Sequence, residues 1–254
     1  MWAGDREQLI LRLLSTADGR METDRLAELL KVSRETIRRD LLKLEAAGKV
    51  RRVHGGVIAV EESAEKPFLA RRSLHAEAKQ RIAQAAARLL KPGESCFIDA
   101  GTTTAAFAVA LTNVALLSVV TNSLEIATTL RNAQPTAGVL LLGGNLATDV
   151  PGTHGELTIG QIARFRPAVA FISTVGVHPE HGATNYLLSE AEVARAMIAN
   201  AGRVVLLADR SKLGEVSRMH VCDCAEIDVL VTERGGHPLL ARLRKAGISK
   251  VVEA

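Results

Sequence analysis

The feature that most constrains the fold is the alternation of short apolar runs with amphipathic helical patterns over residues 75–254. Seven of the runs have the length of buried strands, namely Ser95–Ile98, Leu116–Thr121, Val139–Leu142, Ala168–Ser173, Val204–Ala208, Asp228–Val231 and Lys250–Val252. Helical patterns accompany them near Lys79–Leu90, Thr103–Leu111, Leu124–Arg131, Ile159–Phe165, Ser189–Ala201 and Pro238–Ala246. Such alternation predicts a Rossmann-like α/β domain with a mostly parallel sheet covered on both faces.

Polar residues follow four of the expected strands directly. These segments are Asp99-Ala100-Gly101-Thr102-Thr103-Thr104, Thr121-Asn122-Ser123, Gly143-Gly144-Asn145 and Asp209-Arg210-Ser211-Lys212. Ligands of open α/β sheets bind beyond the carboxyl ends of the strands, so these segments should meet at one edge. Glycine, hydroxyl groups and the start of a helix suit a phosphate. Each segment alone is weak evidence, because Gly and Thr also serve as turn and cap residues.

Residues 1–58 have a different pattern, which predicts three helices and a hairpin. The third expected helix starts after Ser33, buries Ile37, Leu41 and Leu44, and stops at Gly48. Residues 49–58 then alternate around two glycines, as two short strands of a wing would. Two helices joined by a tight turn, the second of them basic, typically place side chains in the major groove of DNA.

The basic face of the third helix and the wing supply the candidate DNA contacts. We expect the helix start to reach base edges through Ser33, Arg34, Glu35 and Thr36. We expect phosphate contacts from Arg38 and Arg39 on the helix and from Arg51 and Arg52 in the wing, where His54 is a further candidate for DNA binding. The alternative reading is an ordinary solvated helix face. The net charge of +4 is small, but much of the excess lies between residues 31 and 58.

The N-terminal region resembles the DeoR family of bacterial repressors. The resemblance lies in Val32-Ser33-x-x-Thr36-Ile37-Arg38-Arg39-Asp40-Leu41-x-x-Leu44-Glu45-x-x-Gly48, followed by Arg52-x-His54-Gly55-Gly56. It implies a winged helix-turn-helix that reads operator DNA.

The C-terminal region is similar to the sensor domain of the same family. The matching pieces are Lys79-x-x-Ile82-Ala83, Asp99-x-Gly101-Thr102-Thr103, Val120-Thr121-Asn122-Ser123, Leu142-Gly143-Gly144, Gly176, His181-Gly182-Ala183-Thr184, Glu192-x-x-x-Ala196-Met197 and Ala208-Asp209-x-Ser211-Lys212. The family's sensor is similar in fold to ribose-5-phosphate isomerase and glucosamine-6-phosphate deaminase. This implies a phosphorylated-sugar effector cradled by Gly101, Thr102 and Thr103.

The same resemblance implies further effector contacts, with sugar hydroxyls or phosphate. They are Asp99, Asn122, Asp209 and Lys212, with Gly143, Gly144 and Lys79 as further candidates. Residues 145–154 depart from the family's usual serine-rich approach to Gly155, and Leu213 replaces the commoner aromatic residue. The departures leave the identity of the sugar open.

Composition sets the remaining expectations. Residues 59–74 are charged with little apolar periodicity, which indicates a linker between a domain of residues 1–58 and a domain of residues 75–254. No run approaches the ~20 apolar residues of a membrane span, and the start lacks a secretory pattern. The three cysteines do not form a disulfide scaffold, so we expect a cytoplasmic protein. We also expect a homo-oligomer, because dimers match repeated half-sites on DNA.

Two alternatives compete with a regulator that has no catalytic residues and needs no cofactor. An isomerase acting on a sugar phosphate would use Asp99, Asp209, Lys212 and Glu192 as acid and base groups. A metal site would use His220, Cys222 and Cys224, which share one face of an extended strand. The usual zinc spacing of paired cysteines is absent, and His178-x-x-His181 reads as a turn.

Overall fold

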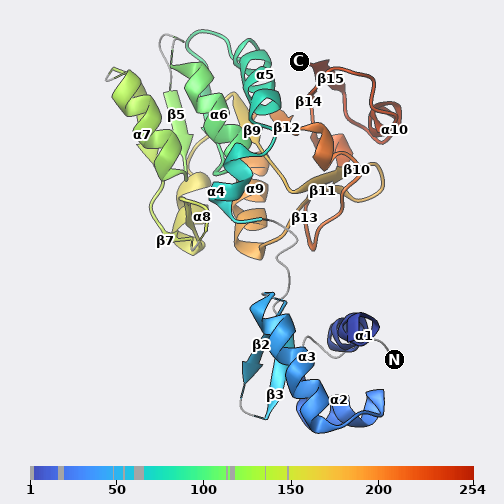
Figure 1. Ribbon diagram of the computed structural model, residues 1–254. Coiled ribbons are helices and arrows are strands. Elements are labelled where there is room, and N and C mark those ends of the chain that lie inside the picture. The colour runs from blue at the N-terminus through green and yellow to red at the C-terminus, as the bar shows by residue number, and fades with distance from the viewer. Residues whose placement is uncertain are drawn as a thin grey trace. The chain divides into compact units, whose positions relative to one another are not determined.

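The computed structural model describes residues 3–16, 20–47, 49–53, 55–59, 66–112, 114, 118–134, 136–147 and 149–254. The chain divides into two compact units, Met1–Glu65 and Lys66–Ala254 (Figure 1). No helix in these described ranges is long and apolar enough to cross a membrane.

The described residues of the first unit form three helices and a small antiparallel sheet. The helices are α1 (Ala3–Thr16), α2 (Thr23–Leu30) and α3 (Arg34–Ala46). The sheet has the order β1-β3-β2 and consists of β1 (Arg20–Glu22), β2 (Val50–Val53) and β3 (Gly56–Ala59). The helices and the β2–β3 hairpin are as predicted, whereas the three-residue strand β1 is too short to give a sequence signal.

A tight turn sets α3 against α2. Lys31 takes a left-handed conformation with φ 52°, and the Val32 amide donates to the Ala27 carbonyl at 3.1 Å. The Ser33 hydroxyl then caps α3 by accepting the Thr36 amide at 3.2 Å, which satisfies one of the unpaired amides of the first turn. Apolar residues at helical spacing, Ile37 among them, bury the inner face of α3. The opposite face is therefore exposed.

The second unit is built on a seven-stranded sheet of order β15-β14-β12-β9-β4-β5-β6, parallel throughout. Its strands are β4 (Ser95–Ile98), β5 (Ser118–Thr121), β6 (Gly138–Leu141), β9 (Val169–Ile172), β12 (Val204–Leu207), β14 (Val229–Thr232) and β15 (Lys250–Glu253). All seven correspond to the runs expected from the sequence. The strand order reverses between β4 and β9, and this switch point is where open α/β sheets bind ligands.

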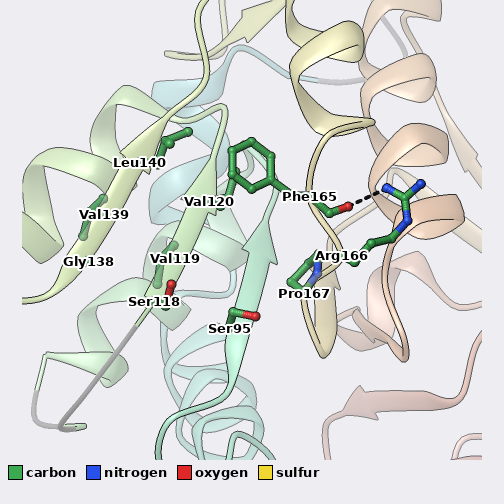
Figure 2. A pocket seen from close by; sticks show the side chains of 10 residues that line it. All are labelled: Ser95, Ser118, Val119, Val120, Gly138, Val139, Leu140, Phe165, Arg166 and Pro167. Atoms are coloured by element: carbon green, nitrogen blue, oxygen red, sulfur yellow. Dashed lines mark hydrogen bonds between the residues drawn. The ribbon is translucent and has the colours of Figure 1, made fainter.

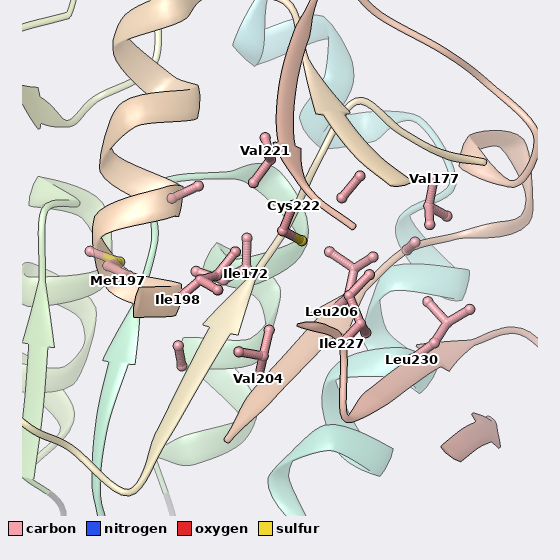
Figure 3. Packing of buried hydrophobic residues seen from close by; sticks show 14 of the residues in the cluster. Ile172, Val177, Met197, Ile198, Val204, Leu206, Val221, Cys222, Ile227 and Leu230 are labelled. Atoms are coloured by element: carbon pink, nitrogen blue, oxygen red, sulfur yellow. The ribbon is translucent and has the colours of Figure 1, made fainter. Parts of the chain in front are cut away.

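Helices cover both faces of the sheet. On one face pack α5 (Ala76–Ala87), α6 (Thr102–Leu111) and α7 (Leu124–Ala133). The other face packs against α8 (Glu156–Ile162), α9 (Leu188–Asn200) and α10 (Leu239–Lys245). Figure 3 shows this second core, where Met197 and Ile198 of α9 lie near Ile172, Val204 and Leu206 of the strands. The predicted doubly covered α/β architecture is confirmed.

Several short elements had no clear sequence signal. A second antiparallel sheet has the order β10-β11-β13, from β10 (Gly176–His178), β11 (Gly182–Asn185) and β13 (Met219–Cys222), and β7 (Asn145–Leu146) pairs with β8 (Thr153–His154). Residues of the expected linker form helix α4 (Phe68–Ser73), whose Phe68 is buried in the second unit. The linker interpretation is therefore wrong for Phe68–Ser73, because six residues are too few to show periodicity.

Candidate DNA interface and effector site

The start of α3 presents the predicted DNA contacts to solvent. Ser33, Arg34 and Glu35 are exposed and Thr36 is half-buried. Farther along the helix, Arg38 and Arg39 are exposed, whereas Ile37 before them and Asp40 after them are buried. The predicted separation of a packed face from a basic face is therefore present.

Ion pairs hold several of these cations. Arg34 Nε lies 2.7 Å from Asp24 Oδ1, and Arg39 Nε lies 3.8 Å from Glu35 Oε1. In the hairpin, Arg51 and Arg52 are both exposed. Arg52 Nε contacts Glu45 Oε2 at 2.8 Å, and the hydrogen bond from the Arg52 amide lowers the pKa of Glu45. The predicted contact His54 lies outside the described residues.

A buried ion pair connects α3 to α1. The guanidinium of Arg6 donates to both carboxylate oxygens of Asp40, from Nε at 2.5 Å and from Nη2 at 3.0 Å. The Asp40 side chain is 3% exposed. This bidentate contact, together with the hydrogen bond that raises the pKa of Arg6, fixes the orientation of the basic helix.

Asp99 lies at the switch point of the large sheet, directly after β4. Its carboxylate accepts the Ser173 amide at 3.1–3.2 Å, so it joins the ends of β4 and β9. Burial raises the pKa of Asp99 to about 7, against the opposing effects of the hydrogen bond from the Ser173 amide and of the charge of Lys212. Near neutral pH this carboxyl group can both donate and accept hydrogen bonds.

The α6 N-terminus lies beside Asp99 and carries three buried threonines in its first turn. The Thr104 hydroxyl donates to the Gly101 carbonyl at 3.0 Å. Thr103 is fully buried, yet its hydroxyl has no hydrogen-bond partner among the described residues. A Cβ at position 101 would lie 2.6 Å from Ser173 Oγ, so the close approach of the two strand ends already requires glycine there.

Asn122 follows β5 and is buried at the same edge. Its Nδ2 donates to the Thr153 carbonyl at 2.9 Å, and the Thr153 amide donates to the Asn122 carbonyl at 2.8 Å. The side-chain Oδ1 of Asn122 is buried without a partner in the described structure. Buried polar atoms are normally satisfied, so Thr103 Oγ1 and Asn122 Oδ1 are candidate contacts for a bound polar group.

Gly143 and Gly144 follow β6, and contacts with α8 explain both glycines. The Gly143 amide donates to Gln161 Oε1 at 3.1 Å, and its carbonyl accepts the Thr158 hydroxyl at 2.8 Å. Gly144 has φ 152°, and a Cβ there would lie 2.1 Å from Thr158 Oγ1. These contacts account for the Gly-Gly pair without a ligand.

Asp209 and Lys212 follow β12, and both have internal partners. The Asp209 carboxylate accepts the Ser211 amide at 3.0 Å and the Ser211 hydroxyl at 2.5 Å. Lys212 Nζ donates to the Thr174 carbonyl at 2.5 Å and its charge acts on Asp99. Lys212 therefore joins the end of β12 to the end of β9 next to Asp99.

Lys79 lies in the first turn of α5 and holds helix α4. Its Nζ donates to the Arg71 carbonyl at 2.5 Å. At the start of α4, the Phe68 amide donates to the carboxylate of Asp149 at 2.9–3.0 Å, and Arg71 Nη2 lies 3.4 Å from Asp149 Oδ2. Asp149 lies between β7 and β8, shortly before Thr153 of β8, which is bound to Asn122.

Ser173, Thr174 and Asp149 belong to this arrangement, and sequence reasoning did not select them. Ser173 and Thr174 directly follow β9, so the strand-end rule would have found them if the strand had been ended at Ile172. Asp149 had no signal, since its contact with Phe68 spans 81 positions.

The alternative metal ligands do not converge. His220 is exposed and contacts Asp223, whereas Cys222 and Cys224 are buried. Burial raises the pKa of Cys222 to about 12 and also raises the pKa of Cys224. Ligand atoms of His178, Glu180 and His181 lie within 4.8 Å of one another. His178 Nδ1, however, accepts the Glu180 amide at 3.1 Å, and Glu180 pairs with Arg242, as expected of a hairpin turn.

The fold and the two sites define a class: a winged helix-turn-helix joined to an α/β sensor domain, which is the architecture of a ligand-responsive DNA-binding regulator. Residues 6–63 match the DeoR-like helix-turn-helix domain, and residues 74–234 match the DeoR C-terminal sensor domain. The chain belongs to the DeoR family of transcriptional regulators, as predicted.

Named relatives are similar over most of their length. The glycerol-3-phosphate regulon repressor of Escherichia coli is 33% identical over 215 residues, which cover 85% of each chain. The transcriptional repressor GlcR of Bacillus subtilis is 35% identical over 236 residues, 92% of this chain and 90% of that protein. Ribose-5-phosphate isomerase A of Methanocaldococcus jannaschii aligns over 55% of each chain with 18% identity and a TM-score of 0.40, too distant for a functional conclusion.

Proposed function

We propose that this regulator represses a carbohydrate-metabolism operon. We further propose that a phosphorylated sugar or polyol binds at the switch point of the sensor sheet and controls the affinity of the protein for operator DNA. The observation that carries the proposal is a pair of buried oxygens that have no hydrogen-bond partner among the described residues, Thr103 Oγ1 at the start of α6 and Asn122 Oδ1 after β5. The names of the relatives support it, since one represses a glycerol-3-phosphate regulon.

The chemistry of the site suits such an effector. A phosphate beside the N-terminus of α6 meets the positive end of the helix dipole and the hydroxyl groups of Thr102 and Thr103. Asp99 and Asn122 then face the hydroxyl groups of the sugar, and Lys212 supplies positive charge nearby. Gly143, Gly144 and Asp209 have contacts within the protein, so we assign them to the framework around the effector and not to contacts with it.

Effector binding reaches the DNA-binding unit through α4 in this proposal. Asn122 contacts Thr153, the same segment carries Asp149, and Asp149 holds the start of α4. In sequence, α4 is the first helix after the segment that joins the two units. A ligand that changes the position of Asn122 and its partner loop therefore changes how α4 is held. Such control requires that the effector bind the two states of α4 with different affinities.

On DNA, we propose that Arg34 reads a base and that Arg38 contacts phosphate. Replacing a phosphate contact weakens binding to all sequences and reduces the salt slope by about 1, whereas replacing a base contact relaxes sequence preference. The comparison of Arg34→Ala with Arg38→Ala on operator and random duplexes tests both roles. Equal losses on both duplexes for both variants would contradict the assignment.

We propose that the chain is not an isomerase. Isomerisation needs a base positioned to move a proton next to a carbonyl, but Asp209 accepts two hydrogen bonds from Ser211 and Lys212 donates to Thr174. Incubation with ribose 5-phosphate and with glucosamine 6-phosphate should give no turnover. Turnover that is lost in Asp99→Asn would overturn this part of the proposal.

The effector site is tested by DNA release. Fluorescence anisotropy of labelled duplex from the upstream region of the gene is followed while glycerol 3-phosphate, ribose 5-phosphate and other phosphosugars are added. We expect one compound of the panel to weaken DNA binding, and Thr102→Ala with Thr103→Ala to abolish that response while DNA affinity without effector is kept. An unchanged response in the double variant would show that the site lies elsewhere.

A further inference from the structure

Strand β9 lies beside β4 at the switch point, yet none of the proposed effector contacts directly follows it. The strand order reverses between these two strands, so a ligand in the crevice meets the ends of both. Asp99 follows β4, and α6 with Thr102 and Thr103 comes next in the chain. Ser173 is the first residue after β9 and is half-buried. Ser173 is therefore the nearest candidate for a contact from the β9 side.

The backbone around Ser173 is fixed by hydrogen bonds that do not involve its side chain. The Ser173 amide donates to both carboxylate oxygens of Asp99 at 3.1–3.2 Å, and the Thr174 carbonyl accepts Lys212 Nζ. The Ser173 hydroxyl has no hydrogen-bond partner among the described residues. Because a hydroxyl group can both donate and accept hydrogen bonds, the Ser173 side chain keeps its full capacity for a ligand.

The Ser173 side chain faces the start of α6. Gly101 is the N-cap of this helix and offers no side chain to the amides of the first turn. A Cβ at Gly101 would lie 2.6 Å from Ser173 Oγ and 3.1 Å from Thr104 Oγ1. A polar side chain at the N-cap normally binds an amide of the first turn. The Ser173 hydroxyl, which comes from the neighbouring strand, therefore lies close to the place that an N-cap side chain would occupy.

Several hydrogen-bond donors at the start of α6 have no acceptor in the part of the chain that the structure describes. They are the backbone amides of Thr102, Thr103 and Thr104 and the buried Thr103 hydroxyl. A phosphate group has enough acceptor oxygens for several amides and hydroxyl groups at once, and a helix N-terminus favours its negative charge. A sugar hydroxyl has fewer lone pairs, so the phosphate is the part of the effector that fits here.

We propose that the Ser173 hydroxyl donates to the phosphate group of the effector and so completes its binding site from the β9 side. This inference rests on the proposed effector site and adds a contact to it. The phosphate then lies between the α6 amides, which follow β4, and Ser173, which follows β9. Because the Ser173 amide also holds Asp99, one residue contacts the phosphate and positions the carboxyl group that faces the sugar.

The opposite ends of the same strands supply a matched control. Ser95 is half-buried like Ser173, but it begins β4 and lines a groove of about 470 Å³ at the far edge of the sheet (Figure 2). Ser95→Ala therefore removes a serine hydroxyl from the same sheet and leaves the effector site unchanged. Ser173→Ala removes the hydroxyl in question and keeps the backbone amide that binds Asp99.

The test is calorimetric titration of the full chain with inorganic phosphate, glycerol 3-phosphate and ribose 5-phosphate. A hydrogen bond to a charged group contributes more than one between neutral groups, so Ser173→Ala should weaken the binding of each phosphate that binds by about tenfold. Ser95→Ala should bind each phosphate as the wild type does. Thermal melting without ligand should give the same Tm for the wild type and both variants.

Unchanged phosphate affinity of Ser173→Ala would overturn the proposal, and a lower Tm of the same variant would then make Ser173 a capping residue of α6. DNA release by a phosphosugar that is equal in wild type and Ser173→Ala would also overturn it, and would leave the proposed function intact. Weaker binding of inorganic phosphate by Ser173→Ala, with no DNA release by any phosphosugar, would support Ser173 as a phosphate contact and overturn the proposed function. A wild type that binds none of these phosphates would overturn both.

Discussion

Thr103 and Thr104 are adjacent, fully buried and differ in whether the hydroxyl group has a partner. We predict that Thr103→Val stabilises the effector-free protein, because it replaces an unpartnered buried hydroxyl with a methyl group of the same shape. An unsatisfied buried polar group costs about 1–3 kcal/mol. The free energy of unfolding should therefore rise by roughly 1–2 kcal/mol, and Tm by about 2–8 °C for a unit of this size.

The control substitution is Thr104→Val, which removes a hydroxyl that donates to the Gly101 carbonyl. That carbonyl also accepts the Ala105 amide at 2.9 Å, so it keeps one partner and the loss should be about 1 kcal/mol. Differential scanning fluorimetry without effector measures both variants. A Tm of Thr103→Val that falls as far as that of Thr104→Val would refute the reasoning.

The gain in stability should come with a loss of function. Because the Thr103 hydroxyl contacts the effector in our proposal, Thr103→Val should bind the effector at least about tenfold more weakly, which corresponds to about 1.4 kcal/mol. Calorimetric titration with the phosphosugar that releases DNA measures this affinity. Proteins commonly keep such unfavourable groups at binding sites at the expense of stability.

Three further predictions concern other carboxylates. Asp40→Ala removes the carboxylate that binds the Arg6 guanidinium in a partly buried pair. We therefore expect it to destabilise the DNA-binding unit by about 3 kcal/mol in a urea titration followed by circular dichroism, whereas Arg39→Ala, at an exposed pair, should change stability by less than about 1 kcal/mol. The pKa of Asp99 is raised from 3.8 to about 7, so between pH 4 and 7 the unfolded chain binds fewer protons and stability should fall as pH rises; a wild-type slope equal to that of Asp99→Asn would contradict this. Asp149→Asn should keep effector affinity within about threefold and abolish effector-induced DNA release. DNA release equal to that of wild type would show that α4 does not couple the effector site to DNA binding.

The central architecture could be predicted from the sequence because its signals are local. Each strand of the large sheet is an apolar run, and Ser33 and the turn at Lys31 define the start of α3. Strand ends also placed Asp99 and Asn122 at one edge, since parallel strands end together. Periodicity and capping therefore carried the fold and the DNA-binding face.

What could not be predicted depends on contacts between distant residues. The partner of the Phe68 amide in α4 is Asp149, and no sequence pattern around either residue predicts this contact. Gly143 and Gly144 look like a ligand loop in sequence, but a Cβ at Gly144 would meet Thr158 and a Cβ at Gly143 would lie 3.2 Å from Gln161. A glycine in the sequence can indicate that a side chain has no room at that position, but only the structure shows which neighbour lies there.

The most direct test of the account is the affinity for operator DNA at several salt concentrations, with and without phosphosugar, for wild type and Thr103→Val. We expect salt-dependent binding for both proteins, release of the wild type by a phosphosugar, and retention of DNA by Thr103→Val at the same effector concentration. Salt-independent binding, or equal release of both proteins, would contradict it.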